Sequence, residues 1–134
     1  MKRLTSINYS NGAFNVAMLL LRVTAAALVI PHGYDKLVHF AEKKATFMNF
    51  MGIGSTLSLT LVIFAEFFCS ILLIVGVFSR LVVIPLIIVM SVALFQAHNF
   101  DVYNTGEKAA LFLVCFLTIL LCGPGKISVD GMMK

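Results

Sequence analysis

The chain has 134 residues, of which 60% are hydrophobic and only 12% are charged, and its mean hydropathy is +1.02. Soluble domains carry about 25% charged residues, so this composition excludes an ordinary soluble protein and predicts an integral membrane protein. The net charge of +4 does not indicate nucleic-acid binding, because Lys and Arg are scattered along the chain rather than gathered in one stripe. The three cysteines form no C-x-x-C pair, which argues against a disulfide framework and dithiol chemistry.

Four apolar stretches approach the length of about 20 residues that crosses a bilayer. They cover residues 14–33, 57–78, 81–98 and 107–122. The first is expected to end at Pro31 and Gly33, which do not sustain a regular helix, and the last at Gly123-Pro124-Gly125. Because the stretches are continuous rather than alternating, a β-barrel is excluded. We expect one all-α membrane domain over residues 1–134, a four-helix antiparallel bundle.

The start of the chain also has the pattern of a cleavable signal, because Lys2 and Arg3 precede an apolar run. Arg22 would interrupt the apolar region of such a signal, and the run continues beyond the small residues that would form a cleavage site. A retained first span is therefore expected.

Residues 34–54, between the first two stretches, mix charged side chains with Leu, Phe and Met at spacings of three and four. This spacing is typical of an interfacial amphipathic helix with one apolar face in the membrane surface; a solvated loop is the alternative.

The loop cations favour an orientation. On the side of the termini lie five of them, Lys2, Arg3, Arg80, Lys126 and Lys134, and on the other side four, Lys36, Lys43, Lys44 and Lys108. The positive-inside rule then predicts a multi-pass protein of the cell membrane with both termini in the cytoplasm.

Two of the stretches carry an ionisable residue near the middle, Arg22 in the first and Glu66 in the second. Counted from Gly33 and from Leu57 at about 1.5 Å per residue, both lie roughly 14 to 16 Å below the same face. The sequence therefore predicts a buried pair in which the guanidinium binds the carboxylate. An ionisable group at this depth suggests a functional site, although a pair that satisfies itself can be purely structural.

Further polar residues are expected at the ends of the stretches, on the side opposite the termini: His32, Gln96, His98 and Glu107. In outline they form a funnel toward Arg22 and Glu66 that can carry protons or seat the polar head of a quinone. Each also has an ordinary explanation, since interfacial His residues reach headgroups and Glu107 suits a helix N-terminus. Two histidines without further ligands make a weak case for haem or a metal, so no metal is expected.

Three segments resemble the DoxX family of small four-helix membrane proteins. They are LLRVTAAALVIPHGYDKL at residues 20–37, AEFFCSILLIVGVFSRL at 65–81 and EKAALFLVCFLTILLCGPGKISVDG at 107–131. On this resemblance the family pattern falls on Arg22, His32, Gly33, Lys36, Glu66, Gly76, Arg80, Glu107, Gly123, Gly125, Ser128 and Asp130. The resemblance implies the fold. It also implies an association with membrane oxidoreductases, because the wider group resembles the membrane subunit of a thiosulfate:quinone oxidoreductase.

Three functions remain open at this point. The first is a membrane subunit of a quinone-linked redox complex, in which Arg22 and Glu66 manage charge and His32 or His98 contacts the quinone. It requires a redox partner protein, because the chain has no dinucleotide, flavin or metal motif. The second is a non-enzymatic scaffold or assembly factor. The third is a small proton or solute transporter, which would form its conduit mainly as a homo-oligomer in the lipid bilayer.

Overall fold

The computed structural model describes residues 2–44, 52–97 and 106–133. Every regular element in these ranges is a helix: α1 (Lys2–Thr5), α2 (Asn11–Val38), α3 (Phe40–Lys43), α4 (Ser55–Ile63), the π-helix η2 (Phe64–Cys69), α5 (Ser70–Val75), α6 (Ser79–Val92), the π-helix η3 (Ala93–Ala97), α7 (Glu107–Cys122) and α8 (Val129–Met132). The predicted all-α class is confirmed.

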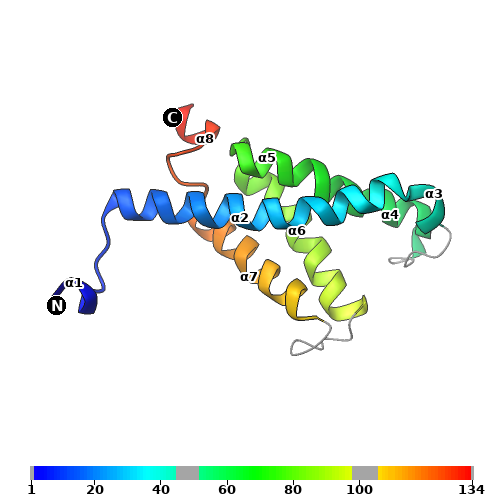
Figure 1. Cartoon of the computed structure of the whole chain (residues 1–134), viewed down its shortest axis with the longest axis horizontal. Coiled ribbons are helices and arrows are strands. Elements are labelled where there is room, and N and C mark those ends of the chain that lie inside the picture. The colour runs from blue at the N-terminus through cyan, green and yellow to red at the C-terminus, as the bar shows by residue number, and fades with distance from the viewer. Residues whose placement is uncertain (1, 45–51, 98–105, 134) are drawn as a thin grey trace.

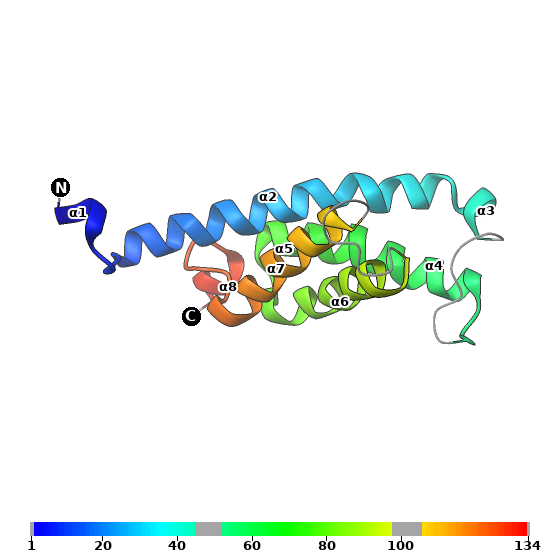
Figure 2. The same cartoon turned by 90° about the horizontal axis from the view of Figure 1, so that it is seen from below.

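The longest helix, α2, lies along a second rod in which α4, η2 and α5 follow one another without a break (Figure 1). The helices α6 and α7 pack against each other and against these two rods (Figure 2). Buried side chains from α2, α5, α6 and α7, among them Ala26, Val29, Leu73, Leu86 and Phe116, form one hydrophobic core. Both ends of the chain lie toward the same end of the molecule, as Figures 1 and 2 show.

Two helices in the described ranges are long and apolar enough to cross a membrane, Asn11–Val38 and Ser55–Val75. Large apolar side chains on their outer faces are at least half exposed, such as Leu20, Leu28 and Phe64. An apolar outer surface of this extent suits contact with lipid rather than water. The predicted stretch 81–98 corresponds to the shorter α6 and η3, and the predicted stretch 107–122 coincides with α7.

The prediction that the first span ends at Pro31 and Gly33 is wrong, because α2 continues to Val38. Pro31 removes only one N–H donor from the helix. Gly33 lets the backbones of α2 and η2 meet, since a Cβ atom placed on it would lie 2.8 Å from the backbone nitrogen of Phe67. The helix thus runs on through two residues that usually end one, and Gly33 serves there as a packing site.

The interfacial helix expected over residues 34–54 is not confirmed. Residues 34–38 complete α2, the helix α3 covers only Phe40–Lys43, and residues 45–51 lie outside the described residues. The second rod begins at Ser55 and ends at Val75, slightly earlier than the predicted 57–78, because Gly76 adopts a left-handed conformation (φ 85°) that ends α5. The next helix, α6, then begins at Ser79.

Candidate functional site

Arg22 is buried within α2, with 1% of its surface exposed. It donates three hydrogen bonds to backbone carbonyls: Nη1 to Pro124 O at 2.7 Å, and Nη2 to Ile127 O at 2.9 Å and to Ile74 O at 3.3 Å. Ile74 lies in the last turn of α5, where backbone carbonyls have no N–H donor within the helix. Pro124 and Ile127 belong to the segment that follows α7. Arg22 therefore fastens that segment and the end of α5 to α2.

Glu66 lies in η2 and is 5% exposed. Its carboxylate accepts hydrogen bonds from the ammonium of Lys36, with Nζ–Oε2 and Nζ–Oε1 distances of 2.9 and 3.3 Å. Lys36 stands in the last turn of α2, and its side chain is 20% exposed. Glu66 is thus almost fully buried in this ion pair, whereas Lys36 is partly exposed on the surface.

The predicted pairing of Arg22 with Glu66 is wrong, although both residues are buried as expected. Glu66 lies level with Gly33, as the close contact between them shows. Arg22 precedes Gly33 by eleven residues, which is about 16 Å along the helix. The prediction placed Leu57 level with Gly33, so it misjudged the axial position of the second rod by about nine residues.

The surroundings of Glu66 differ from an ordinary helix interior. The six residues of η2 form a π-helical turn, and such turns inside α-helices are frequent at functional sites. The hydroxyl of Ser70, four residues after Glu66, is buried with no hydrogen-bond partner among the described residues. Phe67 packs edge-on against Phe68 with ring centroids 5.2 Å apart, and Tyr34 lies 6.3 Å from Phe67. A buried acid therefore stands beside a group of aromatic rings.

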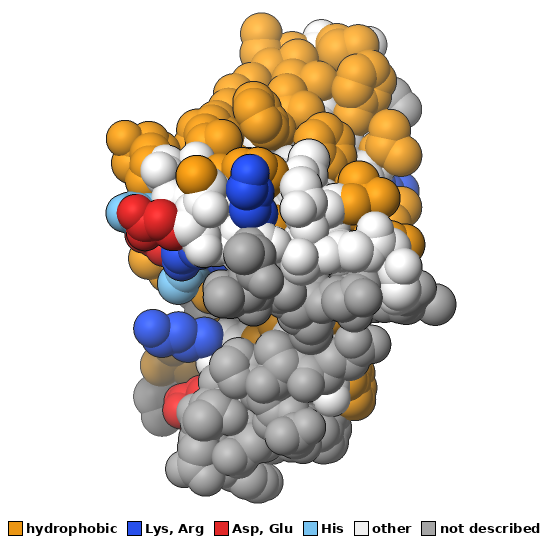
Figure 3. Space-filling view, turned by 90° about the vertical axis from the view of Figure 1, so that its right-hand side faces the viewer, with side chains coloured by type: hydrophobic (Ala, Val, Ile, Leu, Met, Phe, Trp, Pro, Cys, Tyr) orange, Lys and Arg blue, Asp and Glu red, His pale blue; other side chains and the backbone are white. Residues whose placement is uncertain are grey.

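Charged side chains continue outward from Lys36 on the surface of the molecule. Asp35 binds Lys43 (Oδ2–Nζ 2.8 Å) and His39 (Oδ1–Nδ1 3.2 Å), and about half of the Asp35 side chain is exposed. Figure 3 looks onto this end of the molecule and shows acidic, basic and His side chains gathered beside a hydrophobic surface. The pair of Lys36 and Glu66 joins this charged surface to the core.

The structure describes the side chains of only two of the four predicted funnel residues. His32 on α2 and Glu107 at the start of α7 are both exposed, and no hydrogen bond links either to Glu66 within the described ranges. The side chain of Gln96 and all of His98 lie outside the described residues. In the part of the chain that is described, no group of three His, Cys, Asp or Glu residues could hold a metal ion.

A second cluster forms at the other end of α5, and we call it the C-terminal clasp: Arg22, Gly76, Ser128 and Asp130. The carboxylate of Asp130 accepts hydrogen bonds from the backbone N–H groups of Phe78 and Ser79, both at 2.8 Å, and its own N–H donates to Gly76 O at 2.9 Å. Phe78 has a φ of 49°, which non-glycine residues rarely adopt. Asp130 thus holds this strained turn at the start of α6.

Two glycines of the family pattern complete the clasp region. Gly123 (φ 82°) lies against the guanidinium of Arg80, and Gly125 (φ 81°) lies against Asn15 and Met18 on α2. The side-chain oxygen of Asn15 also accepts a hydrogen bond from the Lys126 N–H at 3.0 Å. The positive φ at both positions favours glycine, and at Gly125 the close backbone and Cβ atoms of α2 add to this preference.

Ten of the twelve residues expected from the resemblance fall into two groups, and the exposed His32 and Glu107 belong to neither. Gly33, Lys36 and Glu66 meet at one end of the molecule. Arg22, Gly76, Arg80, Gly123, Gly125, Ser128 and Asp130 gather around the clasp at the other. Sequence reasoning missed Lys36 as the partner of Glu66. Gly33 and Lys36 share a helix face at a spacing of three, but this signal exists only if the helix continues past Pro31.

Comparison with known proteins identifies the family. The family model described as DoxX matches residues 17–99, a range that includes Arg22, Lys36 and Glu66 and excludes the C-terminal segment of the clasp. Neither the curated proteins nor the solved structures contain a match. Since the matched range covers more than half of the chain, and since two of its helices are apolar enough to cross a membrane, the protein belongs to the DoxX family of membrane proteins.

Proposed function

We propose that the protein is a membrane subunit of a quinone-linked redox complex, and that the polar head of the quinone binds beside Lys36 and Glu66. One observation carries this proposal: a buried carboxylate in a π-helical turn is paired with an ammonium group that is one-fifth exposed. Ionisable residues at membrane depth are costly and are commonly kept for function.

The pair has the chemical groups that quinone reduction needs. Conversion of a quinone to a quinol consumes two electrons and two protons. The Lys36 ammonium can donate a hydrogen bond to a quinone oxygen, and Glu66 can accept and release protons next to it. The electrons come from a redox partner protein, because the chain carries no flavin or dinucleotide motif.

The aromatic rings near the pair suit a ring-shaped, lipid-soluble ligand. Tyr34, Phe64 and Phe68 are each about half exposed, at 55%, 51% and 50%. Aromatic rings pack well edge-on or offset against a second ring. A quinone that diffuses in the bilayer can therefore reach these side chains without crossing water.

We further propose that four helical segments cross the cell membrane: α2, the rod from α4 to α5, α6 with η3, and α7. Both termini then lie in the cytoplasm, as the excess of Lys and Arg on their side supports. In this orientation Lys36, near the end of α2, lies toward the opposite side of the membrane.

Two other functions stand as alternatives, each with an observation in its favour. A non-enzymatic scaffold or assembly factor is favoured by Arg22, whose three hydrogen bonds within the described residues go to backbone carbonyls and tie segments of the fold together. A small proton or solute transporter is favoured by the buried hydroxyl of Ser70, one turn from Glu66, which has no hydrogen-bond partner in the part of the chain that is described.

The test is quinone binding by the purified full-length protein in detergent. Titration with a short-chain ubiquinone or menaquinone should give saturable binding that Glu66→Gln and Lys36→Met abolish. Asp35→Asn, which changes an exposed acid one residue from Lys36, should leave binding unchanged. Absence of saturable binding, or equal binding by Glu66→Gln, would refute the proposal. If a stable Lys36→Met, Glu66→Met double variant functions normally in cells, the scaffold hypothesis is favoured. Proton flux into liposomes that contain the wild-type protein would favour the transporter hypothesis.

A further inference from the structure

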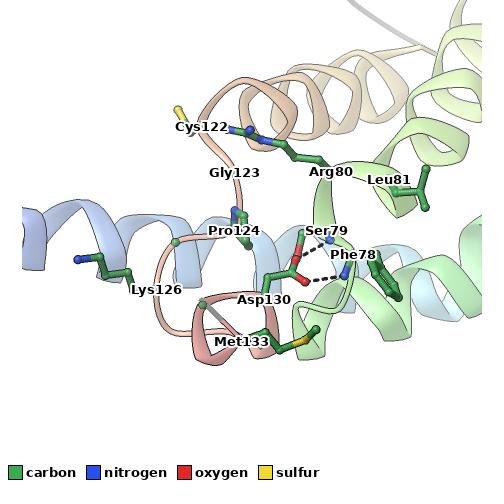
Figure 4. Close-up of a pocket in the computed structure, with 12 residues that line it drawn as sticks. Phe78, Ser79, Arg80, Leu81, Cys122, Gly123, Pro124, Lys126, Asp130 and Met133 are labelled. Carbon is green, nitrogen blue, oxygen red and sulfur yellow. Dashed lines mark hydrogen bonds between the residues drawn. The ribbon is translucent and has the colours of Figure 1, made fainter.

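A groove of about 750 Å³ opens where the turn between α5 and α6, the end of α7 and the C-terminal segment meet. Residues 78–81 line one side of it and residues 122–126 the other, with α8 below (Figure 4). It lies at the clasp end of the molecule, far from Lys36 and Glu66. A ligand in this groove would therefore be distinct from the quinone proposed at Lys36 and Glu66.

The lining of the groove has more cations than acids. Arg80 is exposed and makes one long hydrogen bond, from Nη2 to Leu121 O at 3.4 Å. Its other donors, and the ammonium of Lys126, have no partner among the described residues. Both oxygens of Asp130, the acid in the lining, already accept N–H groups at the start of α6, as the dashed lines in Figure 4 show. With two cations, Arg80 and Lys126, and one acid, Asp130, in its lining, the groove carries a net positive charge.

Large apolar side chains stand next to these cations. Phe78, Leu81 and Met133 all line the groove, and they are 60%, 65% and 69% exposed. Cationic side chains at the end of a membrane helix reach toward headgroups while apolar neighbours contact acyl chains. The combination fits a molecule that has a negative head and a hydrocarbon tail. Free phosphate would use only the cations.

We propose that this groove binds an anionic phospholipid, with the phosphate on Arg80 and Lys126 and an acyl chain along Phe78 and Leu81. The inference does not depend on the quinone proposal, since it uses other residues at the other end of the molecule. If the termini are cytoplasmic, the groove faces the leaflet whose anionic lipids attract basic residues.

The experiment titrates the full-length protein in detergent with phosphatidylglycerol, and counts bound lipids by native mass spectrometry. Phosphatidylcholine and inorganic phosphate are the comparison ligands. We expect phosphatidylglycerol to bind preferentially, and Arg80→Gln and Lys126→Gln to weaken it about fivefold each and roughly 25-fold together. Arg80→Lys should bind nearly as well as the wild type.

The matched control is Lys108→Gln, which removes an exposed Lys at the start of α7 and should leave lipid binding unchanged. Equal binding of phosphatidylcholine, or unchanged affinity in the Arg80→Gln, Lys126→Gln protein, would overturn the proposal. Competition by inorganic phosphate at the same affinity would show a phosphate site and would overturn the lipid assignment. Circular dichroism of each variant confirms that it is folded.

Discussion

Replacement of Arg22 by Met tests whether the clasp holds the fold together. The side chain is 1% exposed, and its two shortest hydrogen bonds, to Pro124 and Ile127, measure 2.7 and 2.9 Å. Hydrogen bonds with a charged partner contribute about 1.5 to 3 kcal/mol each. Met keeps the apolar stem but leaves these carbonyls without a donor, so we expect the free energy of unfolding to fall by about 3 to 5 kcal/mol.

Equilibrium unfolding of the purified protein in mixed detergent micelles, followed by circular dichroism, measures this loss. Arg80→Met is the matched control, because Arg80 is exposed and makes one bond of 3.4 Å. Arg80→Met should lower the free energy of unfolding by no more than about 0.5 kcal/mol. Equal losses in the two variants, or a loss below about 1 kcal/mol for Arg22→Met, would show that Arg22 does not fasten the C-terminal segment.

Three further predictions follow from the packing. In double-mutant cycles on the free energy of unfolding, Lys36→Met and Glu66→Gln should show a coupling energy of about 1 kcal/mol or more. The effects of Arg22→Met and Glu66→Gln should instead be additive to within about 0.5 kcal/mol. Strong coupling between Arg22 and Glu66 would support the pairing predicted from the sequence. Gly33→Ala should lower the free energy of unfolding by about 1 to 3 kcal/mol, because a Cβ atom there meets the η2 backbone. The control Gly12→Ala should leave the free energy of unfolding unchanged, since only the Ser10 hydroxyl lies nearby, at 3.9 Å. Equal effects in the two variants would contradict the close contact at Gly33. Asp130→Ala should cost about 1 to 2 kcal/mol by uncapping α6, and the exposed Glu42→Ala should be neutral in the same unfolding assay. A neutral Asp130→Ala would show that its two hydrogen bonds do not stabilise the turn.

The two clusters have different characters. The clasp consists mainly of hydrogen bonds between charged side chains and backbone groups, some of them at helix ends. Glu66 is paired with a side chain that remains partly exposed, inside a turn that departs from the α-helix. A ligand is therefore more readily accommodated at Glu66 than at Arg22.

Several features of this protein followed from the sequence alone. The apolar composition and the continuous hydrophobic runs required helices in a membrane. The helix over residues 107–122 was predicted with its observed bounds, because Gly123-Pro124-Gly125 ends it locally. The burial of Arg22 and Glu66 also followed, since each lies within an apolar run.

Only the tertiary structure decided which groups these charges contact. Helix ends in sequence do not reveal how far one helix slides along another, and here the second rod lies about nine residues from its expected position along α2. Because of that displacement, Glu66 forms its ion pair with Lys36. The partners of Arg22 at Pro124 and Ile127 are more than one hundred residues away in the chain. Periodicity carries no information on such distant contacts, which arise from packing.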